Sequence, residues 1–143
     1  MEPIDPRSLI PHREPFLLLD AVTELVPGER GRGVWHVPES LPVLAGHFPG
    51  NPVLPGVYQV ESIAQLGAAV VLADPRFAGS LPLFGGIDRA RFRRQVGPGD
   101  LLELEVELQG LGSRAGRGEG RALVGGKVVA EASLLFVIAR AQA

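Results

Sequence analysis

The stretch VYQVESIAQLGAAVVLA, residues 57–73, decides the fold of this chain. Nearly every position in it is apolar or small, and the following Asp74-Pro75 step ends the run because proline cannot continue a helix. The pattern predicts a helix that is buried on most of its sides. At about 1.5 Å per residue it would span roughly 25 Å, which is the width of a small domain and too short for a membrane span.

One carboxylate interrupts this apolar stretch. Glu61 is its only acidic or basic residue, and Gln65 follows one turn later on the same face. A carboxylate in apolar surroundings is costly unless it is paired, hydrogen-bonded or protonated. Burial should raise its pKa, as a general acid requires. Without further information, Glu61 could equally be a buried acid that an arginine satisfies.

A proline-rich loop, GHFPGNPVLPG, precedes the helix at residues 46–56. Each of its prolines fixes its own φ and favours an extended conformation in the residue before it. The loop should therefore be stiff and non-helical, with His47 held in one place. An imidazole held near a buried carboxyl can transfer protons at neutral pH, although a histidine beside a proline loop is more often structural.

The rest of the chain predicts about six strands. Their ranges are 16–26, 30–37, 83–92, 101–110, 114–124 and 127–139, and a short helical turn is expected over residues 5–10. The fourth strand has the clearest pattern, because Leu102, Leu104 and Val106 alternate with glutamates. Gly125-Gly126 is a two-residue hairpin signal. We therefore expect one α+β domain over residues 1–143, with a mostly antiparallel sheet wrapped around the helix.

Composition excludes several classes of protein. The chain has 143 residues, 45% of them hydrophobic, which suffices for a core, and its net charge of −2 gives no bulk attraction to nucleic acid or membranes. It has no cysteine and begins without an apolar leader, so we expect a cytoplasmic protein. Residues 110–120 (GLGSRAGRGEG) do not fit a nucleotide-binding loop and suggest a flexible strand connection. We expect neither a metal nor an organic cofactor.

Four segments of the chain are distinctive: residues 46–57 with 60–65, 10–20, 84–92 and 97–100. Together they resemble the bacterial (3R)-hydroxyacyl-acyl carrier protein dehydratases. GHFPGNPVLPGV followed by VESIAQ is similar to their active-site segment. Residues 10–20 (IPHREPFLLLD) are similar to their LPHR-x-PFLLVD opening, residues 84–92 (FGGIDRARF) to their F-x-GID-x-ARF strand, and residues 97–100 (GPGD) to their PGD turn. The order and spacing of the four segments match, and the resemblance covers nearly the whole chain.

The resemblance implies a hotdog fold, in which the sheet wraps a central helix. It implies a homodimer whose sites combine the histidine of one subunit with the acid of the other, and often a hexamer formed as a trimer of dimers. The implied partner is acyl carrier protein bearing a 3-hydroxyacyl phosphopantetheine thioester. The implied reaction removes water to give the trans-2-enoyl product. A glutamate at position 61, where the related dehydratase-isomerases carry aspartate, favours the simple dehydratase.

The resemblance also assigns roles to residues. His47 suits the base that removes the α-proton, and Glu61 suits the acid for the departing hydroxyl. The backbone N–H groups of Gly56 and Val57 open the helix and could stabilise the thioester oxygen as it gains negative charge. Gly56 would also leave room for the thioester. The remaining expected substrate-site residues are Phe48, Pro55 and Gln65, the last as the partner that orients Glu61.

Other polar residues have structural interpretations or more than one. Arg89, Arg91 and Arg93 alternate along a predicted strand, with Arg94 adjacent. They form either a solvated or ion-paired face or a docking patch for the acidic carrier protein, in which Arg91 and Arg94 would contact the substrate's phosphate. His12 is expected to hydrogen-bond the N-terminal turn, and His36 to be an ordinary strand residue.

Two other functions remain open from the sequence. One is a hotdog thioesterase, which would direct water at the thioester carbonyl; such hydrolysis needs no α-proton base, so His47 argues against it. The other is a non-catalytic hotdog module that binds acyl chains, which an intact His47 and Glu61 disfavour.

Overall fold

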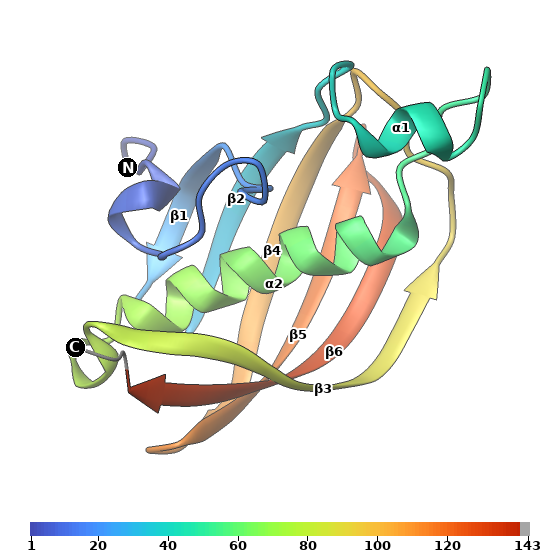
Figure 1. Cartoon of the computed structure of the whole chain (residues 1–143). Coiled ribbons are helices and arrows are strands. Elements are labelled where there is room, and N and C mark those ends of the chain that lie inside the picture. Colours follow the sequence, from blue (N-terminus) through green and yellow to red (C-terminus); the bar gives the residue numbers. More distant parts are fainter. Residues whose placement is uncertain (141–143) are drawn as a thin grey trace.

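One long helix lies against a single curved sheet (Figure 1). The structure is a computed structural model and describes residues 1–140. Its strands are β1 (Ala21–Val26), β2 (Arg30–His36), β3 (Ser80–Phe92), β4 (Leu101–Leu111), β5 (Ala115–Val124) and β6 (Lys127–Arg140). Its helices are α1 (Val43–Gly46) and α2 (Gly56–Leu72), with 3-10 turns at Pro6–Ser8 and Pro75–Phe77. All strand pairs are antiparallel, in the order β1-β2-β4-β5-β6-β3, so the predicted sheet around a central helix is observed.

The helix α2 is buried on most sides, as its composition predicts. Ile63, Leu66 and Val70 are fully buried, and the helix contacts every strand of the sheet. On β4, Leu102 and Leu104 face this core while the glutamates between them point outward, which confirms the predicted alternation. Burial of this apolar face supplies most of the favourable free energy of folding.

Glycines in β5 let the helix lie directly on the sheet. A Cβ on Gly120 would lie 2.3 Å from Cγ2 of Ile63 on α2. The expectation that residues 110–120 form a flexible connection is therefore wrong for most of that stretch. Glycine is present there because the helix occupies the space of a side chain.

The first strand begins later than predicted, at Ala21 rather than at residue 16. The backbone of Leu18 forms hydrogen bonds with side chains of α2 instead of with a neighbouring strand: its N–H donates to Oε1 of Gln65 and its carbonyl accepts from Ser62. The predicted helical turn near the N-terminus is present but shorter, as Pro6–Ser8. No helix within residues 1–140 has the length and apolar character needed to cross a membrane.

Candidate active site

His47 is held in one orientation at the end of α1. Its ring Nδ1 lies 2.7 Å from the carbonyl oxygen of Val53, and the N–H of Val53 donates back to the carbonyl of His47 at 2.7 Å. A carbonyl oxygen can only accept, so Nδ1 carries the hydrogen and the neutral ring leaves Nε2 unprotonated. His47 is half-buried. The geometry therefore prepares Nε2 to act as a base.

The proline-rich loop is stiff for the reasons that the sequence predicts, and backbone bonds add to this. Phe48 and Asn51 exchange two backbone hydrogen bonds of 2.9 and 2.8 Å, and the N–H of Leu54 donates to the carbonyl of Val96. The Phe48 ring lies against the His47 ring, with centroids 4.0 Å apart. Phe48 is nevertheless 51% exposed, so one face of this aromatic pair is open to a substrate or a second molecule.

The N-terminus of α2 offers free hydrogen-bond donors. Pro55 is its N-cap and supplies no side-chain cap, and the first backbone N–H with a partner is that of Tyr58, which donates to the carbonyl of Pro55. The N–H groups of Gly56 and Val57 have no acceptor within residues 1–140. Such donors at a helix N-terminus stabilise a developing negative charge.

The space beside Gly56 is filled from within the chain. A Cβ on Gly56 would lie 2.8 Å from Cε1 of Phe92. Gly56 is therefore needed so that the ring of Phe92 can pack against the helix terminus. This contact is a reason for the glycine that the sequence did not indicate, and the expected close approach of a thioester stays a prediction.

Glu61 lies further along α2, with its side chain 15% exposed. Its Oε2 accepts a 2.8 Å hydrogen bond from Nε2 of Gln65. Burial raises the pKa of Glu61, and the hydrogen bond from Gln65 acts in the opposite direction as the smaller effect. A carboxyl that keeps its proton to a higher pH is suited to donate that proton to a leaving hydroxyl.

Gln65 is fully buried and all its amide hydrogens are used. Its Nε2 donates to the carbonyl of Phe16 at 2.7 Å as well as to Glu61, and its Oε1 accepts from the N–H of Leu18. Gln65 therefore fixes the Glu61 carboxyl and joins α2 to the segment before β1. Its amide has no hydrogen left to donate to a substrate. The expectation that Gln65 contacts the substrate directly stays a prediction.

His12 is the neighbour of Glu61 that the sequence did not identify. Its Nε2 lies 3.9 Å from Oε2 of Glu61. The expectation that the His12 side chain bonds the N-terminal turn is wrong, because Arg13 makes those contacts, to the carbonyls of Arg7 and Ile10. No local pattern links His12 with Glu61, because the contact joins two segments that are distant in the chain.

Within residues 1–140, no hydrogen bond or ion pair joins His47 to Glu61. His47 contacts Val53 and Phe48, whereas Glu61 contacts Gln65 and His12. A groove of about 400 Å³ lies on the outer face of the sheet and contains neither residue. Its lining is a set of paired glutamates and arginines, such as Arg121 with Glu105 at 2.7 Å, which is a solvated charged surface. Within residues 1–140, His47 and Glu61 thus have separate sets of neighbours, which we call the two half-sites.

The basic residues near the end of β3 differ in their partners. Arg93 forms an ion pair with Glu131 at 2.9 Å. Arg91 and Arg94 are exposed and form no ion pair within residues 1–140. They are free to bind an anion, while Arg93 fits the structural interpretation. Across the same residues, no group of three His, Asp or Glu side chains is arranged to hold a metal ion.

Comparison with known proteins assigns this site to a family. The FabA-like domain family matches residues 10–133. The chain belongs to the FabA-like family. Its relatives include two proteins named 3-hydroxyacyl-acyl-carrier-protein dehydratase FabZ. The one from Enterococcus faecalis is 54% identical over 132 residues, covering 92% of this chain and 94% of the relative. The one from Symbiobacterium thermophilum is 53% identical over 131 residues, covering 92% of each.

A solved structure confirms the fold. The dehydratase heterocomplex ApeI:P from Xenorhabdus doucetiae contains a chain that matches with a TM-score of 0.80 at 21% identity, over 94% of this chain and 90% of that one. At this identity the likeness concerns the fold alone. Together with the antiparallel sheet around α2, it confirms the predicted α+β hotdog class.

Proposed function

We propose that this FabA-like protein is a lyase of fatty acid biosynthesis that dehydrates (3R)-3-hydroxyacyl-acyl carrier protein to trans-2-enoyl-acyl carrier protein. The curated relatives support the reaction, since they carry that dehydratase name at about half identity over nearly their full length. The observation that carries the proposal is His47, whose Nδ1 bond to Val53 leaves Nε2 unprotonated and able to act as a base. We place the enzyme in the cytoplasm, as the sequence predicts.

The residues divide the reaction among them. Nε2 of His47 takes the proton from C2 of the substrate, and the released electron pair forms the C2–C3 double bond. The N–H groups of Gly56 and Val57 donate to the thioester oxygen while it carries negative charge, and one such donor contributes about 3 kcal/mol. The carboxyl of Glu61 gives its proton to the C3 hydroxyl, which leaves as water. Phe48 and Pro55 border the acyl thioester.

We further propose that a second copy of the chain completes the site. The separate half-sites of His47 and Glu61 support this, and so does the edge strand β3. Several large apolar side chains on or beside that edge are between 44% and 51% exposed: Leu83, Phe84, Ile87 and Phe92. An exposed apolar edge strand is a template for pairing with another strand. A hexamer would place three such dimers together.

Mixed dimers test the shared site. If each site takes His47 from one subunit and Glu61 from the other, a dimer of one His47→Ala chain and one Glu61→Gln chain has one intact site. Equal amounts of the two inactive variants, unfolded and refolded together, should then recover about a quarter of wild-type activity. The assay is enoyl formation before and after the exchange. Sites built within single chains would give no recovery, with co-purification of two differently tagged chains showing that mixed dimers had formed.

Docking of the carrier protein is a separate proposal. Arg91 and Arg94 are exposed and unpaired within residues 1–140, and they suit an acidic carrier protein or the phosphate of its arm. The double variant Arg91→Ala/Arg94→Ala should raise KM for carrier-bound substrate by about tenfold at low salt, and leave KM for a short thioester unchanged. Arg32→Ala, on the outer sheet face, is the control. An equal rise of KM for both substrates would contradict this docking role.

A further inference from the structure

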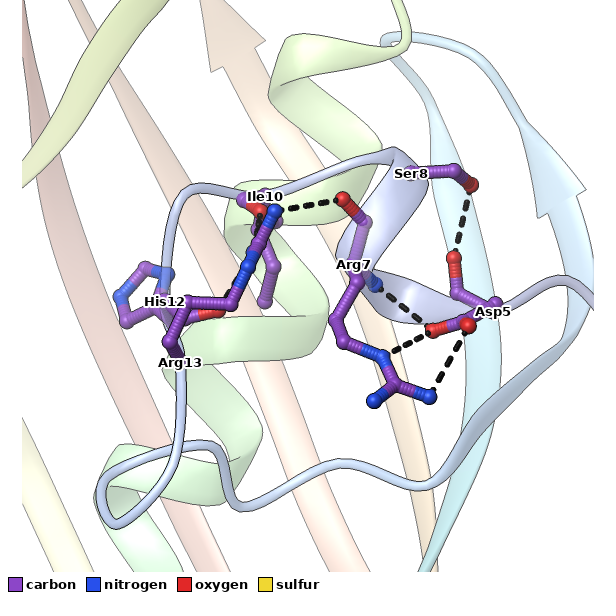
Figure 2. Close-up of polar contacts among 6 residues, drawn as sticks. All are labelled: Asp5, Arg7, Ser8, Ile10, His12 and Arg13. Atoms are coloured by element: carbon purple, nitrogen blue, oxygen red, sulfur yellow. Dashed lines mark hydrogen bonds and ion pairs between the residues drawn. The ribbon is translucent and has the colours of Figure 1, made fainter.

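The N-terminal segment is folded tightly over the Glu61 side of α2. The guanidinium of Arg13 donates to three backbone carbonyls, those of Ile10 at 2.9 Å, His12 at 2.7 Å and Arg7 at 3.1 Å. Arg7 in turn is paired with Asp5 at 3.1 Å. Figure 2 shows the result: the loop curls around the Arg13 side chain, and the His12 ring lies on the opposite side from the Asp5–Arg7 pair. The backbone of His12 is therefore fixed by the residue that follows it.

This arrangement directs the His12 ring at one oxygen of the catalytic carboxyl. The His12 side chain is 21% exposed, and its Nε2 lies 3.9 Å from Oε2 of Glu61. Its Nδ1 is buried without a hydrogen-bond partner. An imidazole with a buried, unpaired nitrogen is costly, and a small movement of the ring would bring Nε2 within hydrogen-bond distance of Oε2.

The two contacts of Glu61 fall on the same atom, and this determines where its proton can be. Gln65 and His12 both face Oε2. An amide N–H can only donate, so Oε2 is the acceptor in its bond with Gln65, and the proton of the neutral carboxyl is on Oε1. Oε1 has no hydrogen-bond partner within residues 1–140. It is the oxygen available to a substrate hydroxyl.

We propose that His12 is a positioning residue for the dehydration: together with Gln65 it holds Oε2 of Glu61, so that the proton on Oε1 is presented to the leaving hydroxyl. This inference rests on the proposed function of Glu61. His12 acts on the substrate only through that carboxyl. In this way the N-terminal segment contributes to the reaction.

The charge of His12 matters for this role. Burial, with a smaller contribution from the neighbouring Arg13 cation, lowers the pKa of His12, so its ring is neutral at neutral pH. A cation at this position would favour the ionised form of Glu61, which has no proton to donate. The charged or titratable groups that face Glu61 are His12 from the N-terminal segment, with Arg13 behind it, and in the proposed dimer the second copy's His47. Gln65, on the same helix, does not titrate.

Three substitutions of His12 distinguish a positioning role from a purely structural role. His12→Gln keeps a neutral N–H donor and should retain kcat within about threefold. His12→Ala leaves Gln65 as the single group that holds Oε2, so the carboxyl is less well oriented and kcat should fall between about 10-fold and 100-fold with KM little changed. His12→Lys should lower kcat at neutral pH and move the alkaline limb of the kcat–pH profile down by about one unit, because the cation favours ionised Glu61. His36→Gln, on an exposed strand histidine, is the matched control.

Steady-state kinetics on 3-hydroxyacyl and enoyl carrier-protein substrates from about pH 5 to pH 9 give all three readouts, with thermal unfolding to verify folding. The inference is overturned if His12→Ala has wild-type kcat, or if folded His12→Lys keeps the wild-type alkaline limb. The wild-type enzyme distinguishes this failure from that of the proposed function: a wild type that dehydrates while the His12 variants match it refutes the positioning role alone. A wild type without dehydration refutes the function itself.

Discussion

His47→Ala should lower kcat for dehydration by about 10³-fold, within the range of a lost general base. The variant removes Nε2, the group that we propose takes the α-proton, and leaves the N–H donors of α2 intact. KM should change little, because the imidazole contributes to the transition state more than to binding. The measurement is the absorbance of the enoyl thioester, followed in both directions.

The control for this variant must exclude a folding defect. Removing the bond between His47 and Val53 costs about 1 kcal/mol, so the loop could loosen. His47→Gln retains a side-chain N–H that can reach Val53, and it should be as inactive as His47→Ala. His36→Ala, on an exposed strand position, should be fully active. If His47→Gln kept activity within about threefold of wild type, the base would have to be another group.

Glu61→Gln is expected to inactivate the enzyme without destabilising it. The amide cannot donate an acidic proton, so kcat should fall by about 10²–10⁴-fold. The glutamine can still accept the hydrogen bond from Gln65, and it removes a buried ionisable group. We therefore expect lower activity together with unchanged or higher stability. The buried carboxyl serves the reaction but costs the fold free energy.

The pH dependence of both properties follows from the raised pKa of Glu61. The folded protein binds this proton more tightly than the unfolded chain does. The stabilisation is therefore complete below the unfolded pKa, near 4.5, and is lost as pH rises through the higher folded pKa. Activity should fall over the same range as the acid ionises. Urea unfolding at about pH 4 and pH 8 should show that Glu61→Gln is more stable relative to wild type at the higher pH.

Glu103→Gln is the matched control, because Glu103 is exposed on β4 and its substitution should change neither property. A Glu61→Gln protein that dehydrates normally would remove the acid from the mechanism. One that loses stability most at pH 8 would show that the ionised carboxylate is favoured in the fold, contrary to the effect of burial.

Local composition was enough to predict the helix α2 and the hairpin strands. The apolar run after the proline loop and the alternation in β4 depend on periodicity, which is visible in a sequence. The glycines of β5 were misjudged because Gly120 is needed for the close approach of Ile63, which is distant in the chain. A glycine-rich stretch suggests flexibility in a sequence, but in a strand it can mark the close approach of a packed helix.

The two proposed catalytic groups, His47 and Glu61, were predicted from the sequence, but their surroundings were not. Gln65 was expected beside Glu61 because a four-residue spacing places both on one helical face. The approach of His12 to Glu61 and the bonds of Leu18 to Ser62 and Gln65 join segments more than forty residues apart in the printed sequence. Such contacts depend on tertiary packing and leave no periodic signal, and they also explain why β1 starts late.

The most direct test of the central claim gives the wild-type enzyme 3-hydroxybutyryl carrier protein and follows two products in the same sample. Enoyl thioester is detected by its absorbance, and free thiol by a thiol-reactive dye. We predict that enoyl thioester forms, that crotonyl carrier protein is hydrated in the reverse direction, and that no thiol is released. Release of free thiol without enoyl product would contradict the dehydratase and establish a thioesterase, and the absence of both products would leave an acyl-binding module.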